Sequence, residues 1–365
     1  MFLSPPARLE RYDASLDTPD SDEAEIGREI NRTMARIREI TFADEGHALR
    51  SVHAKSHGLL EAEMTIDADL PPELAQGLFA QPGRYPVIMR FSTTPGDLLD
   101  DSVSTPRGVA LKVVGVSGDR LPGPERATQD FVLVDGKTFP APNAKVFLAN
   151  LKLLAPTTDK AEGLKKVLSA GLRGLEHLVE AAGGESGLLK NLGGQPETHI
   201  LGDSFYSQLP IRFGDHIAKI ALAPVSPNLV ALRDAPLQLN GKPDGLREAV
   251  NAFFTGETGE WDLRVQFCTD LKHMPIDPAN KAWDEDASPY LPVARIRAAP
   301  QVGWSTARSE TVDDCMSFSP WHGLEAHRPL GSLMRLRREA YEQSRQFRSE
   351  RNSRPVIEPE SAALP

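Results

Sequence analysis

The chain has 365 residues, 40% of them hydrophobic and 25% charged, so it can bury a sizeable core in one large domain or two smaller ones. Its formal net charge of -10 argues against nucleic acid and against anionic membrane surfaces as partners. We therefore expect neither a nucleic-acid nor a membrane partner.

The cysteines and the first residues predict a compartment. Cys268 and Cys315 can form at most one disulfide, and their surroundings show no scaffold spacing. Residues 1–6 lack the basic start and apolar run of a secretory signal. No stretch approaches the roughly 20 apolar residues that a membrane-spanning helix needs. Together these features predict a cytoplasmic protein with reduced thiols.

The first two thirds of the chain predict an α+β fold with an antiparallel sheet or barrel. Residues 1–22 are rich in Pro, Asp and Ser and are expected to form an extended arm, a feature that a homodimer could use. Apolar residues at helical spacing predict a helix from Ile26 to Ile40. Turns rich in Gly and Pro, without regular helices between them, favour antiparallel pairing of the strands that follow. The predicted strands are Leu59–Ile66, Tyr85–Phe91, Val109–Val116, Asp130–Val134 and Ile217–Ala223.

The remaining segments complete a three-part organisation. A helical insertion is predicted at about 145–182, and strands and turns are expected from Leu188 to Phe267. The last helix is predicted from about Leu333 to Arg351. We expect one domain over residues 23–351, between the arm at 1–22 and a tail at 352–365. That tail holds few large apolar groups and is expected to be loose or to wrap a partner.

The last helix carries residues with metal-binding potential. Arg337, Tyr341 and Arg348 are four and seven positions apart, so they share one face. A tyrosine is a poor metal ligand until its phenolate is stabilised, and a guanidinium one turn away favours that phenolate. Most arginine–tyrosine pairs on helices are surface neighbours, however. The spacing alone does not decide between the two interpretations.

Four ordered motifs elsewhere bear on that choice. They are R-S-V-H-A-K at 50–55, R-F-S at 90–92, R-G-V-A-L-K at 107–112 and M-S-F-S-P at 316–320. A histidine in such an apolar run is by itself more often a hydrogen-bonded core residue than a catalyst. In this order, and ahead of Arg337 and Tyr341, the motifs resemble the catalase superfamily over most of residues 45 to 350. The chain is most similar to the short catalase-related haem peroxidases.

The resemblance implies a fold and a set of roles. The fold is a catalase-like antiparallel β-barrel core with surrounding helices over residues 23–351, with haem b buried between the barrel and the C-terminal helix. His53 is implied as the distal acid–base group, with Ser92 bonded to its imidazole and Val52 crowding the iron. Tyr341 is implied as the axial iron ligand. The residues implied to contact the haem are Arg50, Arg90, Phe131, Phe139, Arg337 and Arg348.

The sequence departs from the family in two places. The asparagine that orients peroxide is missing before Phe131, where Thr128 or Gln129 is the available replacement donor. Tyr341 is followed by Glu342 instead of Pro-Asp-Thr, and the outer helical segments of larger catalases are absent. We therefore predict a peroxidase that reduces hydrogen peroxide or organic hydroperoxides with a small organic reductant, with weak catalase activity.

Two alternatives stay open at this point. Allene oxide synthase-type enzymes, which rearrange fatty-acid hydroperoxides, share the resemblance, but a threonine commonly precedes their distal histidine where this chain has Val52. A non-catalytic haem-binding or sensing protein is compatible with the missing asparagine. The retained His53 and Ser92 argue against that second alternative.

Overall fold

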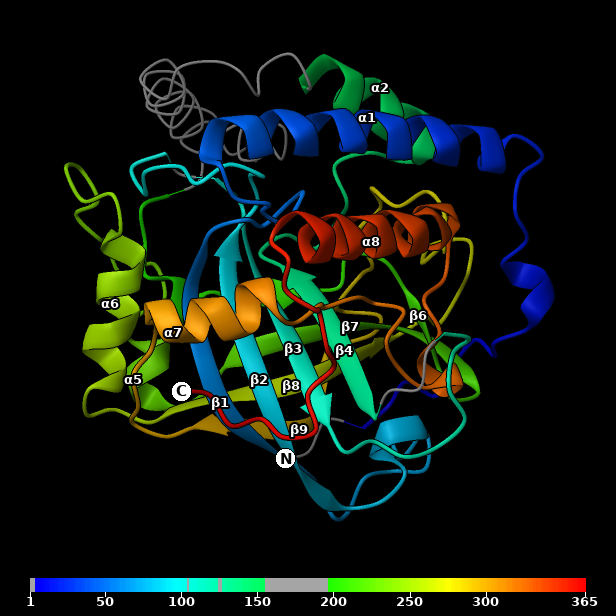
Figure 1. Cartoon of the computed structure of the whole chain (residues 1–365). Coiled ribbons are helices and arrows are strands. Elements are labelled where there is room, and N and C mark those ends of the chain that lie inside the picture. The colour runs from blue at the N-terminus through cyan, green and yellow to red at the C-terminus, as the bar shows by residue number, and fades with distance from the viewer. Residues whose placement is uncertain (1–3, 104, 124–126, 155–195) are drawn as a thin grey trace, which may run out of the picture.

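The centre of the molecule is a closed antiparallel β-barrel (Figure 1). The computed structural model describes residues 4–103, 105–123, 127–154 and 196–365. The strands pair in the order β5-β4-β3-β2-β1-β9-β8-β7-β6, and a further pairing of β5 with β7 closes the ring and leaves β6 outside it. The strands are β1 Ser56–Ile66, β2 Gly83–Thr93, β3 Arg107–Val114, β4 Thr128–Val134, β5 Phe205–Tyr206, β6 Ile211–Phe213, β7 His216–Pro224, β8 Gly259–Phe267 and β9 Leu291–Ala298.

Strand alternation decides which side chains fill the barrel and which leave it. Successive residues of a strand point to opposite faces. In β2, Met89 and Phe91 belong to the buried interior, which is lined by large apolar residues of all the long strands. Their neighbours Arg90 and Ser92 therefore project from the outer face, toward the helices. The polar residues of the R-F-S motif thus share one side of the sheet.

Six helices in the described part of the chain surround the barrel (Figure 1). They are α1 Glu23–Glu45, α2 Ala144–Leu154, α5 Pro227–Val230, α6 Gly245–Phe254, α7 Thr306–Ser309 and α8 Ser332–Arg351. Helix α1 packs on both α2 and α8, because Ile30 and Met34 form an apolar stripe that meets Leu148 and Leu336. None of the described helices combines the length and apolar character needed to cross a membrane.

The observed elements confirm the predicted barrel and its first and last helices, and they correct one expectation. Residues 245–254 form helix α6 instead of strand and turn, because Leu246, Val250 and Phe254, spaced four apart, are buried on one face. Strand β9 and helix α7 were not predicted. Of the helical insertion expected at about 145–182, the part beyond residue 154 lies outside the described residues.

Both ends of the chain pack on the barrel. In the arm, the Glu10 amide donates to the Cys268 carbonyl at 2.9 Å and the Tyr12 amide to the Asp215 carbonyl at 2.8 Å. In the tail, the Leu364 amide donates to a Glu61 carboxylate oxygen at 2.9 Å, and Ala362 is buried. The expectation of a loose tail was wrong, because these apolar and backbone contacts hold it against its own chain.

Candidate functional site

A cavity of about 720 Å³, part of it open to solvent, lies between the outer face of the barrel and helix α8. The strand side contributes the segment before β1 together with β2, β3 and β4. The helix side contributes the face of α8 that carries Tyr341. Most of the predicted site residues meet here: Arg50, Val52, His53, Arg90, Ser92, Tyr341 and Arg348 all line the cavity.

The barrel holds His53 in an unusual backbone conformation. Its φ of 55° lies in the left-handed region, which a non-glycine residue adopts rarely and at a cost. The His53 amide donates to the Thr94 carbonyl at 2.7 Å, and its Nδ1 lies 3.1 Å from Ser92 Oγ. A Cβ on Gly108 would come within 2.6 Å of His53 Cε1, so the ring needs a glycine there. Backbone and ring are therefore both fixed by barrel strands.

The surroundings of His53 keep its imidazole neutral. Burial lowers the pKa of His53 to about 3, and the positive charges of Arg90, Arg337 and Arg50 act in the same direction. A neutral imidazole offers one nitrogen as a proton acceptor. In the tautomer whose Nδ1–H donates to Ser92 Oγ, Nε2 is the nitrogen available to take a proton from a molecule in the cavity.

Helix α8 places Tyr341 on the side of the cavity opposite the barrel strands. Arg337, one turn earlier, donates from Nη2 to Tyr341 Oη at 2.5 Å. Its guanidinium carbon also lies 5.2 Å from the centre of the tyrosine ring. Arg337 itself does not line the cavity but reaches it through this contact. The half-buried phenol is thus held next to a positive charge, as the shared helical face predicts.

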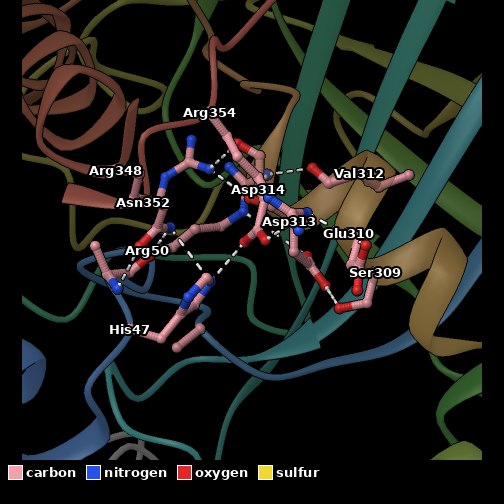
Figure 2. Close-up of polar contacts among 12 residues, drawn as sticks. His47, Arg50, Ser309, Glu310, Val312, Asp313, Asp314, Arg348, Asn352 and Arg354 are labelled. Atoms are coloured by element: carbon pink, nitrogen blue, oxygen red, sulfur yellow. Dashed lines mark hydrogen bonds and ion pairs between the residues drawn. The ribbon is translucent and has the colours of Figure 1, made fainter. Parts of the chain in front are cut away.

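Arg50 and Arg348 converge on a π-helical turn, η6 Glu310–Asp314, at one rim of the cavity (Figure 2). Arg50 Nη2 donates to the carbonyls of Val312 at 2.8 Å and Met316 at 3.0 Å. Arg348 donates to the carbonyls of Asp313 and Met316. The Nε of each arginine is buried and has no hydrogen-bond partner among the described residues. Buried N–H donors on a positively charged guanidinium, when they have no partner, suit an anionic group such as a carboxylate.

Arg90 differs from these two arginines. It is buried, with Nε 2.6 Å from Asp313 Oδ1. Its Nη2 donates to the backbone carbonyls of His53 at 2.8 Å and Ala54 at 3.1 Å. These hydrogen bonds of Arg90 are directed at protein groups, whereas the sequence predicted a role toward a haem propionate.

The structure places Thr128 and Gln129 away from the cavity. Thr128 Oγ1 lies 3.4 Å from a Glu358 oxygen, beside a buried ion pair in which Lys112 Nζ is 2.7 Å from Asp130 Oδ1. Gln129 Oε1 accepts from the Leu324 amide at 2.9 Å. Neither residue lies where it could replace the missing asparagine. The barrel wall of the cavity is instead apolar at Val109, Ala110 and Val132.

Phe131 and Phe139 also lie elsewhere. Phe131 points into the barrel, with its ring centre 6.4 Å from that of Phe79. Phe139 pairs edge to face with Phe147 at 5.5 Å. The reason for Phe131 is strand alternation: its neighbour Val132 occupies the outer face and lines the cavity, and Phe131 cannot share that face. The phenylalanine that lines the cavity among the described residues is Phe318, from the M-S-F-S-P segment.

Asp313 is a residue of this site that the sequence motifs did not indicate. It accepts from Ser56 Oγ at 2.7 Å and from Ser309 Oγ at 2.7 Å, in addition to Arg90. Burial opposes its ionisation, but Arg90, Arg50 and the two hydroxyls outweigh burial and hold the pKa of Asp313 below its ordinary value. No local pattern marks it, since it is one of two adjacent aspartates in an irregular turn.

The donor set fits one kind of cofactor. A flat, largely apolar molecule would contact Ala110, Val132 and Phe318, while carboxylates on its edge would meet the guanidinium groups of Arg50 and Arg348. A metal at its centre would have Tyr341 as a possible ligand. An iron porphyrin with propionates has these three properties.

Comparisons with known proteins agree on the architecture. No protein-family model matches the chain, and no curated protein matches it. A fungal catalase superposes with a TM-score of 0.59 at 16% identity, covering 87% of this chain and 64% of its own. Catalase A from Saccharomyces cerevisiae gives 0.58 at 15%, covering 84% and 62%. A bacterial catalase gives 0.55 at 16%, covering 96% and 66%. The chain thus spans about two thirds of the length of these structures, and it has the catalase-like fold.

Proposed function

We propose that the protein is a haem b-dependent peroxidase that reduces hydrogen peroxide or organic hydroperoxides with a small organic electron donor, and that its catalase activity is weak. The observation that carries the proposal is the neutral His53, fixed by Ser92 on the barrel, in the same cavity as a tyrosine paired with Arg337. The similarity of the fold to that of catalases supports a peroxide as the class of substrate.

Named residues of this chain would hold the cofactor. Tyr341 would ligate the iron, with Arg337 stabilising the phenolate form. Arg50 and Arg348, which both line the cavity, would bind the propionates through their guanidinium groups. The haem, when bound, supplies the redox chemistry by which electrons from a donor reach peroxide.

His53 would move the proton that peroxide cleavage requires. Its Nε2 takes the proton from one peroxide oxygen and returns it to the oxygen that leaves. With two further electrons and protons from the donor, the peroxide ROOH becomes ROH and water. Ser92 supports this cycle because it keeps Nδ1 engaged and the ring in place.

The apolar barrel wall favours peroxidase over catalase chemistry. Ala110 and Val132 line the region where the family uses an amide to orient hydrogen peroxide. Without that donor, a second hydrogen peroxide is poorly held as a reductant. Val52 lies beside His53 and is 41% exposed at the rim, which supports access for bulkier organic molecules.

Replacing His53 with Ala tests the proposal. We expect the haem absorbance band to survive while the rate of peroxide reduction falls by about 100- to 10,000-fold, the range for loss of a general acid–base group. His273→Ala is the matched control, since His273 is exposed and bonds only to Asp270 among the contacts of its side chain. Unchanged turnover in His53→Ala would contradict the proton-transfer role.

Product analysis separates the proposal from its alternatives. A lipid hydroperoxide incubated with the haem-loaded protein should give the alcohol only when a donor such as guaiacol is present. A rearranged product formed without a donor would identify an isomerase of the allene oxide synthase type. Absence of any reaction with peroxide in rapid mixing would favour a haem-binding or sensing protein.

A further inference from the structure

A chain of contacts links Asp313 to the backbone of His53. Asp313 Oδ1 accepts from Arg90 Nε at 2.6 Å, and Arg90 Nη2 donates to the carbonyls of His53 and Ala54. One guanidinium therefore joins a carboxylate on η6 to two consecutive carbonyls in the segment before β1. Arg90 is 2% exposed, so these contacts are shielded from solvent and from screening by salt.

The backbone that Arg90 contacts is the strained one. The left-handed conformation of His53 persists only where the surroundings impose it. The amides of His53 and Ala54 are held from one side by the carbonyls of Thr94 at 2.7 Å and Pro95 at 3.0 Å. The carbonyls of the same two residues are held by Arg90. Amides and carbonyls are thus fixed by different parts of the molecule.

Asp313 is itself fixed before it meets Arg90. The hydroxyls of Ser56 and Ser309 both donate to Asp313 Oδ2 at 2.7 Å, which leaves Oδ1 for the guanidinium. Ser56 is fixed in turn, because Trp304 Nε1 donates to its hydroxyl at 2.9 Å. An aspartate held from both sides and facing a buried arginine is an anchor rather than a surface ion pair.

The neighbouring Asp314 serves different groups (Figure 2). Its Oδ1 lies 2.8 Å from His47 Nε2, and its Oδ2 lies 3.4 Å from Arg354 Nη1. Those contacts tie the end of α1 and the start of the tail to η6. They do not involve Arg90 or the His53 backbone. The side chains of Asp313 and Asp314 therefore contact different residues, and Asp314 can serve as the matched control for Asp313.

We propose that Asp313 is a positioning residue for the distal histidine: it orients Arg90, which fixes the His53 and Ala54 carbonyls and so keeps the imidazole against Ser92. The consequence for peroxide reduction rests on the function proposed above. The anchoring of the His53 backbone does not.

The test compares Asp313→Asn with Asp314→Asn in the haem-loaded protein. Asparagine keeps the shape and accepts one hydroxyl, but it lacks the charge that pairs with Arg90. Amide hydrogen exchange, followed by mass spectrometry on a peptide covering residues 50–56, should become at least about tenfold faster in Asp313→Asn only. The kcat/KM for peroxide should fall by about 10- to 100-fold through kcat, as expected for a misplaced catalytic group.

Arg90→Lys provides a second, independent variant. A lysine ammonium cannot hold the planar fork that reaches a carboxylate and two carbonyls, so exchange at 50–56 should again accelerate. Combining Arg90→Lys with Asp313→Asn should add little further acceleration, because both act through one chain of contacts. Unchanged exchange in both single variants, or equal acceleration in Asp314→Asn, would overturn the proposal. Faster exchange with His53→Ala fully active would instead refute the proposed function and leave the anchoring intact.

Discussion

The two walls of the cavity are built differently. On the barrel wall, His53 and Ser92 bond to each other, and Arg90, which contacts the His53 backbone, pairs with Asp313, 223 positions further along the sequence. On the helix wall, Tyr341 is half-buried and receives its polar contact from Arg337, four positions away on the same helix. The contacts that position His53 are therefore long-range, whereas the one that positions the Tyr341 phenol is local.

This difference indicates that the two walls have different roles. Long-range contacts in a barrel fix a side chain before any ligand arrives, which suits a group that must transfer a proton with little reorganisation. A local pair on a helix holds a ligand atom without a contact to the barrel. We therefore expect perturbations of the barrel wall to affect folding and proton transfer, and perturbations of α8 to affect cofactor binding.

The largest expected effect is loss of the folded barrel in acid. Burial lowers the pKa of His327 to about 3, that of His199 to about 4 and that of His57 well below its ordinary value, whereas α8 carries no histidine. The unfolded chain, with an ordinary histidine pKa of 6.5, binds more protons than the folded chain between these values. Stability is therefore full above about pH 6.5 and falls as the pH drops toward 4.

Urea titrations between pH 8 and pH 4 would measure this fall. Asp135, whose pKa burial raises to about 7, acts in the opposite direction over this window, as do Asp101 and Asp203, whose pKa values burial also raises. Against them stand four histidines, since burial also lowers the pKa of His53 to about 3. The urea midpoint should decrease steadily below pH 6.5. A midpoint that stays constant from pH 7 to pH 5 would show that the histidines are not kept neutral by folding.

A smaller effect is expected from the helix wall. Tyr341→Phe removes the proposed metal ligand, so haem affinity should fall by more than the roughly 10- to 100-fold that loss of an outer partner costs. The fold should remain, because the phenol oxygen makes its contact within α8. Haem titration followed by absorbance, with the melting temperature of the haem-free protein as control, measures both quantities.

Arg337→Gln is the graded comparison for that variant. It keeps Tyr341 and removes its positive partner, so its loss of haem affinity should stay within the outer-partner range. Equal affinities in Tyr341→Phe and the unaltered protein would remove Tyr341 from the metal-binding role. They would also end the contrast between the two walls.

The smallest expected effect is that of Ser92→Ala on the barrel wall. Losing one neutral hydrogen bond costs about 1 kcal/mol, so peroxide turnover should fall by about fivefold. Haem content should not change, because Ser92 contacts the imidazole rather than the helix. Steady-state kinetics at matched haem occupancy measures the change. A loss as large as that in His53→Ala would mean that Ser92 does more than orient the ring.

Sequence reasoning performed best where a signal is local. Spacing placed Tyr341 near Arg337, and the resemblance of the R-F-S motif at 90–92 named Ser92 as the partner of His53. Sequence reasoning failed for Phe131, because a residue that matches a family motif can still lie on the other face of its strand, here β4. It also missed α6, whose apolar residues lie among turn-forming ones. The possible homodimer stays a prediction.

The sequence by itself determined the antiparallel strands and the first and last helices, which follow from periodicity. The resemblance of its ordered motifs to the catalase superfamily added the catalase-like barrel and most of the side chains that meet in the cavity. Both signals are properties of residues near one another in the chain. Only the tertiary structure decided that the two-residue strand β5 closes the ring, that the tail packs on β1 and that Arg90 pairs with Asp313. The physical reason is that such contacts depend on which distant surfaces pack together, and no local pattern encodes that choice.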